Sequence, residues 1–184
     1  MKSNIISSIK LSLLLIIIFS GVYTLFIWGV AQLMPNSGKG EMITHHHKTF
    51  YTNIGQSFTS DAYFNGRPSA VAYNAAGSGG SNKGPSNEEY LLQVKARIDT
   101  FLMHNPSVHK EEIPIDLITA SGSGLDPNIS IQAAKVQVKR IAFIRKIDEE
   151  VLINLINQNS EKPFLGLFGP AKINVLKLNI ALDK

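Results

Sequence analysis

The stretch from Leu11 to Leu33 contains no charged residue and consists mainly of Leu, Ile, Phe and Val. A helix of this length is about 35 Å long, which is enough to cross the hydrocarbon core of a bilayer with some tilt. We therefore expect a transmembrane helix over residues 11–33. It would separate a short N-terminal segment, residues 1–10, from a tether, residues 34–48, and a folded domain, residues 49–184.

The charges beside this stretch predict its orientation. Lys2 and Lys10 precede it with no acidic residue to offset them, so the positive-inside rule places the N-terminus in the cytoplasm and the domain outside. A cleaved signal peptide is the alternative, since Gly29-Val30-Ala31 resembles a cleavage site. The apolar core of a signal peptide is shorter, about 7–15 residues, so we favour an uncleaved anchor.

Small or weakly polar residues inside the span could contact either another transmembrane helix or lipid. Ser12, Ser20, Gly21 and Thr24 are the kind of residue that lets transmembrane helices approach closely. They are equally compatible with a face that contacts lipid only. A single span has no second helix with which to line a channel, so we expect no transport pathway within this chain.

Composition limits what the rest of the chain can be. The 184 residues suit one anchor and one domain, and 17% charged with 44% hydrophobic residues excludes a mainly disordered protein. There is no cysteine, which excludes disulfides, Cys-based zinc sites and thiol nucleophiles. The net charge is only +4, with no Lys/Arg-rich run, so nucleic-acid binding is not supported.

Helical and strand patterns mix in the domain without regular alternation, which predicts a compact α+β fold. Ser86 and Glu89 resemble a capping box for a helix that Asn105-Pro106 ends, with a core-facing stripe of Leu91, Val94, Ile98 and Leu102. Ser130 is placed to cap a helix reaching Arg145, with Ala134, Val138, Ile141 and Ala142 on one face, and Asp148 to cap another. Short strands or loops are expected in 50–58 and from Tyr63 onward, and strands in 113–120 and 171–182.

Three consecutive histidines, His45, His46 and His47, lie in the tether. Neighbouring residues of a flexible segment cannot all face one ion with regular geometry, and no acidic or Cys partner follows closely. We interpret them as a solvated segment and assign no metal site.

Two long polar stretches, residues 64–87 and 116–130, are the most unusual part of the domain. In the first, Gly77 to Gly84 resembles a phosphate-binding loop, but Pro85 stands where a P-loop needs Lys and Asn82 where a dinucleotide loop needs Gly. Weak anion binding by its amides stays possible, and a structural or partner-contact loop is favoured.

The second stretch resembles a nucleophile elbow around Ser123. Ser121 occupies the position at which that motif needs its first Gly, and nothing marks His104 or His109 as a base. Asp126-Pro127 is typical of a turn. The sequence therefore predicts a strand, a tight loop of exposed amides and a helix start.

Three long side chains are candidates for anchoring. Arg67, between Gly66 and Pro68, suits bidentate bonding to a carboxylate or to backbone carbonyls, either within the domain or across a subunit interface. Gln137 and Arg140 are three residues apart and share a helix face. They could contact a partner or organise the 121–126 loop.

The two polar stretches together with Ile54 to Phe58, Gln132 to Ala134 and Ile173 to Asn179 resemble one family along the whole chain. That family is the C subunit (KdpC family) of the bacterial Kdp potassium-transporting P-type ATPase. One departure is Ile131, where many relatives have Pro. The motif residues that we assign to partner contact or structure are Gly66, Arg67, Pro68, Ser69, Tyr73, Asn74, Ser78, Gly79, Gly80, Ser81, Asn82, Ser121, Gly122, Ser123, Gly124, Leu125, Asp126, Gln137 and Arg140.

The resemblance implies a non-catalytic accessory subunit of the bacterial inner membrane. Its partners would be a channel-like potassium-binding subunit and a P-type ATPase subunit, the latter holding ATP and Mg²⁺, with potassium as the transported ion. The family role includes assembly and, as a catalytic chaperone, a raised ATP affinity of the pump. The alternatives are a membrane-anchored extracytoplasmic ligand-binding protein that uses the Gly-rich loops, and an anchored Ser hydrolase, which lacks a visible Ser–His pair.

Overall fold

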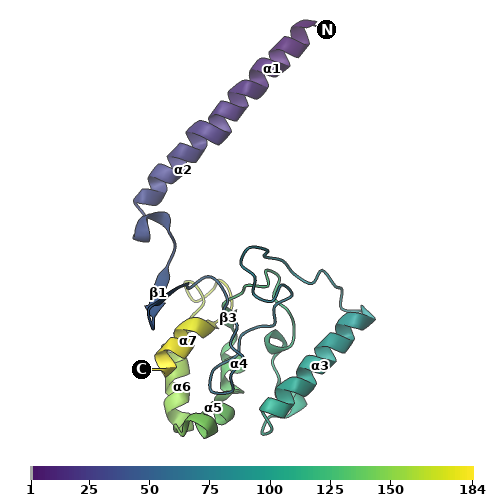
Figure 1. The fold of residues 1–184 in the computed structure, drawn as a ribbon, viewed down its shortest axis with the longest axis vertical. Coiled ribbons are helices and arrows are strands. Elements are labelled where there is room, and N and C mark those ends of the chain that lie inside the picture. The colour runs from purple at the N-terminus through teal and green to yellow at the C-terminus, as the bar shows by residue number, and fades with distance from the viewer. Residues whose placement is uncertain (1) are drawn as a thin grey trace. The chain divides into compact units, whose positions relative to one another are not determined.

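The computed structural model describes residues 2–184 and divides into two compact units, Met1–Met42 and Ile43–Lys184. The first unit is a long apolar helix formed by α1 (Lys2–Ile16), a π-helical segment η1 (Ile17–Val22) and α2 (Tyr23–Gln32) (Figure 1). Its span-like part, Asn4–Gln32, has 29 residues. The most apolar window of 18 residues has a mean hydropathy of 2.4, and none of that window is buried within the protein. The length and composition of this part fit a helix that crosses a membrane.

The hydroxyl groups in the middle of this helix bond to its own backbone. Ser20 donates its hydroxyl to the carbonyl of Ile16, and Thr24 donates to the carbonyl of Phe19. Both hydroxyls are thus satisfied within their own helix, as lipid requires. Beyond α2, the 3₁₀ turn η2 (Pro35–Gly38) ends the helix, because Pro35 has no N–H to extend it.

The second unit contains helices and two small antiparallel sheets, so the α+β prediction is confirmed. β1 (Met42–His45) precedes β2 (Lys48–Tyr51) in a two-stranded sheet. The other sheet has the order β3 (Asn128–Ile129), β5 (Lys172–Asn174), β4 (Ser160–Glu161). In it Ile129 pairs with Ile173, and Ser160 pairs with the same residue on the other side.

The helices of this unit are α3 (Glu88–His104), α4 (Ile131–Lys135), α5 (Val138–Arg145), α6 (Glu149–Gln158) and α7 (Val175–Leu182), with 3₁₀ turns η3 (Lys110–Glu112) and η4 (Ile115–Leu117). Helices α4 to α7 and the β3-β5-β4 sheet surround one apolar core. Its fully buried apolar side chains include Phe64, Ile141, Leu152, Ile156, Ile173 and Leu178. Phe64 comes from the long loop region, so this core also fixes the start of the first polar stretch.

The local capping predictions for the later helices are confirmed. Ser130 accepts a hydrogen bond from the Ala133 amide at 3.0 Å, and Asp148 accepts one from Glu150 at 2.9 Å. The predicted face of Ala134, Val138 and Ile141 is buried. The helix expected over 130–145 is, however, divided into α4 and α5 at Val136 and Gln137.

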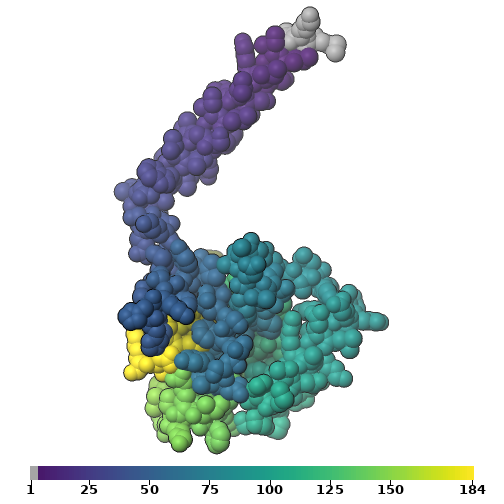
Figure 2. All heavy atoms as spheres, viewed as in Figure 1, coloured from purple at the N-terminus to yellow at the C-terminus, as the bar shows by residue number. Residues whose placement is uncertain are grey.

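Helix α3 occurs where it was predicted and ends before Asn105, but two details differ. The cap is Asn87, which accepts from the Tyr90 amide at 2.9 Å, rather than Ser86. The stripe is only partly core-facing, since Ile98 and Leu102 pack against the core while Leu91 is 51% exposed. Figures 1 and 2 show α3 at the edge of the domain, which leaves its first turns without a neighbouring element.

Two predicted strands are wrong. Residues 113–120 form the turn η4 and coil, because Pro114 begins a tight turn in which Leu117 and Ile118 bond back to Pro114 and Ile115. Residues 171–182 form only three residues of strand before α7 begins. Asn174 causes the change, since its side chain accepts from the Lys177 amide at 3.1 Å and caps the helix.

Candidate functional site

The two polar stretches lie against each other and form the candidate site. The Gly79 amide donates to the carbonyl of Ser123 at 2.8 Å, and the Ser78 hydroxyl donates to the same oxygen at 2.9 Å. Further along, the Ser121 amide donates to the carbonyl of Pro68 at 3.1 Å. These segments are more than forty residues apart in the chain, so their hydrogen bonds join two separate loops into one unit, which we call the loop pair (residues 66–82 and 121–126).

Glycines permit the close approach of the two loops. An added Cβ at Gly80 would lie 2.9 Å from the carbonyl oxygen of Gly122. At Gly124, which has a φ of +69°, it would lie 2.5 Å from Val71 Cγ2 and 2.7 Å from the Gly79 oxygen. Only glycine fits such a position without strain. In the predicted tight loop, Gly122 and Ser123 are exposed, whereas Ser121 and Gly124 are buried, so only part of the loop is open to solvent.

An ion pair crosses the loop pair at one end. Arg67 donates to the Asp126 carboxylate at 3.1 Å, and the other oxygen of that carboxylate accepts from the Asn128 amide at 3.0 Å. The Tyr73 hydroxyl donates to the Arg67 carbonyl, and burial raises the pKa of that hydroxyl. Arg67 therefore acts as an anchor within the domain, which is one of the two roles considered for it. Asp126 is its ion-pair partner as well as a turn residue.

The other predicted motif residues have local roles or face outward. Ser69 accepts from the amides of Val71 and Tyr73, and Asn74 accepts from the Ala76 amide. Leu125 is buried, whereas Asn82 is exposed at a positive φ of 53°. Ser81 is half-buried. The exposed residues of the loop pair are therefore held in place by a framework in which most polar groups bond to each other, the buried Arg67 Nε being an exception.

Gln137 and Arg140 lie together, but their hydrogen bonds go to residues 61–65 rather than to the 121–126 loop. Gln137 accepts from the Asn65 amide at 2.8 Å and from Arg140 at 2.7 Å. Arg140 also donates to the Tyr63 carbonyl at 3.0 Å and to Asp61 at 3.1 Å. Both side chains are buried. They fix the segment that leads into the loop pair.

Sequence reasoning missed three residues that support this arrangement. Asn179 brackets Phe64 by accepting from its amide and donating to its carbonyl, each at 2.9 Å. Gly55 donates to the Leu125 carbonyl at 2.7 Å and has no room for a Cβ beside Asp126. Asn174 donates to the Thr52 carbonyl at 2.7 Å. The available signal was a pair of asparagines in the otherwise apolar C-terminal stretch, where an unpaired amide would be costly.

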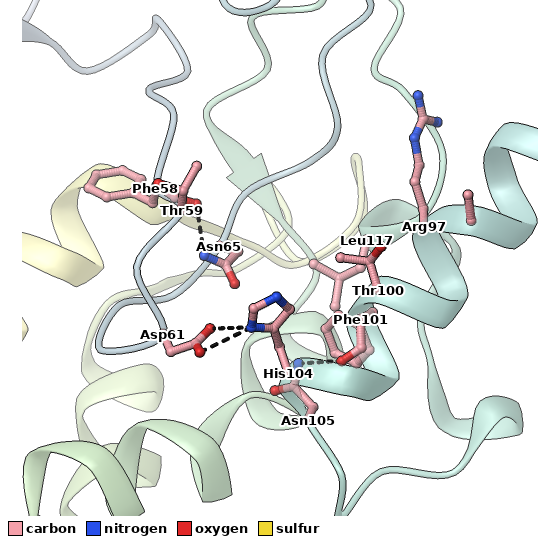
Figure 3. Close-up of a pocket in the computed structure, with 11 residues that line it drawn as sticks. Phe58, Thr59, Asp61, Asn65, Arg97, Thr100, Phe101, His104, Asn105 and Leu117 are labelled. Atoms are coloured by element: carbon pink, nitrogen blue, oxygen red, sulfur yellow. Dashed lines mark hydrogen bonds and ion pairs between the residues drawn. The ribbon is translucent and has the colours of Figure 1, made fainter.

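A pocket of about 440 Å³ lies between α3 and residues 58–65 (Figure 3). At its base Asp61 contacts His104 at 2.9 Å and Arg140 at 3.1 Å. The bond from His104 lowers the pKa of Asp61 most, burial opposes this, and Arg140 adds to it. The buried side-chain oxygen of Asn105, another lining residue, has no hydrogen-bond partner. Both histidines weighed as hydrolase bases thus lie outside the loop pair, and His104 is paired with a carboxylate.

Among the described residues, His45, His46 and Asp183 bring three possible metal ligands within 4.8 Å of one another. An acidic partner therefore does exist in the fold, contrary to the expectation from the sequence. Asp183 already accepts from Arg145 at 2.7 Å and from Tyr63 at 3.0 Å. Burial alone would raise the pKa of Asp183, but these bonds outweigh it and lower the pKa. Because the Arg145 cation repels a metal at this carboxylate, we assign no metal here.

The fold and the loop pair define a class of protein. It has one apolar helix that carries an α+β domain, and the two unusual loops of that domain bond to each other. The family model described as K+-transporting ATPase, c chain (KdpC) matches residues 5–184. The chain therefore belongs to the KdpC family.

Curated relatives agree with this assignment over the full length. A protein of Flavobacterium psychrophilum is 53% identical over 182 residues, 98% of each chain. One of Bacteroides thetaiotaomicron is 50% identical over 185 residues, again 98% of each chain, and one of Bacillus thuringiensis subsp. konkukian is 43% identical over 187 residues, 100% of this chain and 97% of the relative. Each is named potassium-transporting ATPase KdpC subunit.

Proposed function

We propose that this chain is a non-catalytic accessory subunit of an ATP-driven potassium uptake complex, needed for its assembly or stability. Its partners are a channel-like potassium-binding subunit and a P-type ATPase subunit, which holds ATP and Mg²⁺. The name shared by its relatives supports the complex, and the single apolar helix supports the accessory role, because one helix cannot enclose a path for an ion.

The observation that carries the proposal is the loop pair. Most of its named hydroxyls, amides and charges bond to one another, although Arg67 and Asp126 also line a pocket of about 310 Å³ and the buried Arg67 Nε has no hydrogen-bond partner. An arrangement of this kind holds a surface in fixed shape, which suits recognition of a protein partner since little conformational freedom is lost on binding. Catalysis would require a nucleophile beside a base, and the two histidines considered for that role lie elsewhere.

The topology that we propose limits how this subunit can affect ATP. With the N-terminus in the cytoplasm, the domain lies outside the inner membrane, on the side opposite to ATP. A raised ATP affinity of the pump must then act through the membrane helix or through the channel-like subunit, as a coupling free energy between distant sites.

Purification of the full chain, tagged at Lys184, from potassium-starved cells in mild detergent tests the proposal. Mass spectrometry should find a P-type ATPase and a multi-span membrane protein with it. Deletion of the chain should abolish potassium-dependent ATP hydrolysis in the membranes. A stable, unaccompanied monomer together with unchanged pump activity after deletion would refute the accessory role.

A matched pair of glycine variants tests the loop pair within the same experiment. Gly124→Val forces a side chain into Val71 and Gly79 and should reduce recovery of the partners at least tenfold. Gly84→Ala, outside the loop pair, meets no atom within 4 Å and should leave recovery unchanged. Equal recovery with both variants would show that the loop pair does not carry partner binding.

One observation favours a second candidate, the ligand-binding protein, but at a different place from the Gly-rich loops. The pocket beside α3 is lined in part by Asn105, whose buried side-chain oxygen has no hydrogen-bond partner. A thermal-shift screen of the full chain with small alcohols and amines tests this. Saturable stabilisation lost in Asn105→Leu would support it, and no shift with any compound would reject it.

A further inference from the structure

The loop between β4 and β5 exposes an unusual amount of apolar surface. Phe164, Leu165, Leu167 and Phe168 are 72%, 74%, 81% and 64% exposed. We call residues 163–170 the apolar tip. Elsewhere in residues 43–184, large exposed apolar side chains come singly or in pairs. Four such side chains within five positions form the kind of patch that marks a contact with another surface.

The apolar tip has its own ordered backbone. The Phe164 amide donates to the Phe168 carbonyl at 2.9 Å, and the Phe168 amide donates back at 3.0 Å. Leu165 and Gly166 turn the chain at φ values of 53° and 73°. A bulky residue such as Leu rarely adopts a positive φ. The turn thus closes its backbone bonds while directing its apolar side chains outward.

The base of this loop is fixed to the core. Glu161 pairs with Lys172, and Ser160 pairs with the fully buried Ile173. The tip therefore cannot turn inward to bury its side chains without breaking the sheet. Lys162 and Lys172 flank it, and the Lys172 ammonium group lies 3.5 Å from the Glu161 carboxylate. Lysines beside an apolar segment can place their stems along the acyl boundary and their ammonium groups among lipid headgroups.

The length of the chain determines what the tip can reach. Only residues 33–41 separate the end of α2 from the start of β1, and nine extended residues span at most about 30 Å. If α2 lies in a bilayer, the domain is held beside that bilayer permanently. An apolar loop of this size would bind lipid only weakly on its own. Because the helix already holds the molecule at the bilayer, contact between the loop and lipid is intramolecular and costs no further translational freedom.

We propose that the apolar tip is a second membrane contact of this protein, inserting Phe164, Leu165, Leu167 and Phe168 into the interface of the same bilayer that holds its helix. The occupant is the lipid surface: the acyl boundary for the four side chains and anionic headgroups for Lys162. This inference does not depend on the accessory-subunit role, since it concerns the chain alone in a bilayer.

The chain has no cysteine, so single reporter positions can be introduced cleanly. Leu167→Cys, carrying an environment-sensitive nitrobenzoxadiazole label, reports on the tip. Met103→Cys on α3 is the matched control, since Met103 is also apolar and is 71% exposed. Each full-length variant is reconstituted into vesicles of phosphatidylethanolamine and phosphatidylglycerol that contain lipids with a nitroxide near the headgroup.

The label at position 167 should be quenched at least threefold more strongly by the nitroxide lipids than the label at 103, and at least threefold less by aqueous cobalt. Adding Phe164→Ser and Phe168→Ser should remove both differences, while far-UV circular dichroism verifies the fold. Equal quenching at 167 and 103 would overturn the proposal. A second outcome would also overturn the proposal: the label at 167 is never quenched by the nitroxide lipids and is shielded from cobalt only when co-purified membrane proteins are present. The tip would then contact protein rather than lipid.

Discussion

Replacing Gln137 with Leu should destabilise the domain severely, although Leu is similar in size and apolar. Gln137 is 0% exposed and accepts from the Asn65 amide and from Arg140, while it donates to the carbonyls of Asn65 and Ala133. Leu leaves each of these groups without that partner. A buried group left without its partner costs more than the bond itself contributes to the native state.

The magnitude follows from two of these groups. The orphaned Asn65 amide costs about 1–3 kcal/mol, nearer the lower end because it is only partly buried. The lost bond to the Arg140 guanidinium is charge-assisted and contributes about 1.5–3 kcal/mol. Together they predict a loss of about 3–4 kcal/mol, which corresponds to a Tm lower by roughly 10 °C for a domain of this size.

Urea unfolding of the full chain in mild detergent, followed by far-UV circular dichroism, measures this loss. Gln132→Leu is the control, since Gln132 lies in the neighbouring helix α4, only five residues away, with an exposed side chain. Its effect should stay within about 0.5 kcal/mol. A loss below about 1 kcal/mol for Gln137→Leu would show that residues 61–65 are held by other contacts, and would refute the reasoning.

Three further predictions concern other parts of the molecule. Gly124→Ala should cost about 2–3 kcal/mol in urea unfolding, because its positive φ and the nearby atoms both oppose a Cβ; a value equal to that of Gly122→Ala would contradict this. Asp183→Asn should destabilise at pH 7 and less so at pH 3, because a carboxylate with a lowered pKa stabilises the fold fully above its unfolded pKa of about 3.8 and loses this effect as the pH falls through its lower folded pKa; a gap in urea midpoint between variant and parent that did not narrow would be inconsistent. Ser107→Cys in intact cells should react with a membrane-impermeant maleimide, whereas Ser3→Cys should react only after permeabilisation; the reverse pattern would invert the proposed topology.

Local signals predicted much of the chain because their physics is local. The apolar run of residues 11–33 needs no partner to be recognised, and the caps Ser130 and Asp148 act on amides two or three residues away. The polar stretches were recognised as unusual, but their joining through Ser123 and Pro68 depends on contacts between distant loops.

The two wrong strand predictions also concern segments whose structure depends on contacts with distant parts of the chain. Residues 113–120 have the composition of a strand, yet no neighbouring strand pairs with them in the described fold, and turns satisfy their backbone instead. In residues 171–182, alternation of apolar and polar side chains fits a strand and the beginning of a helix equally well over three residues. Pairing of β5 with both β3 and β4 sets the strand, and the Asn174 cap ends it.

The sequence by itself determined the apolar helix, the class of the domain and the family, since these follow from composition, local periodicity and long ordered motifs. Only the tertiary structure decided what the motif residues do. Arg67 faces Asp126, Arg140 faces Asp61, and Asn179 holds Phe64, each across fifty or more residues of chain. Partners at such separations are chosen by how the whole core packs, because each buried polar group must find a bond wherever the fold places one.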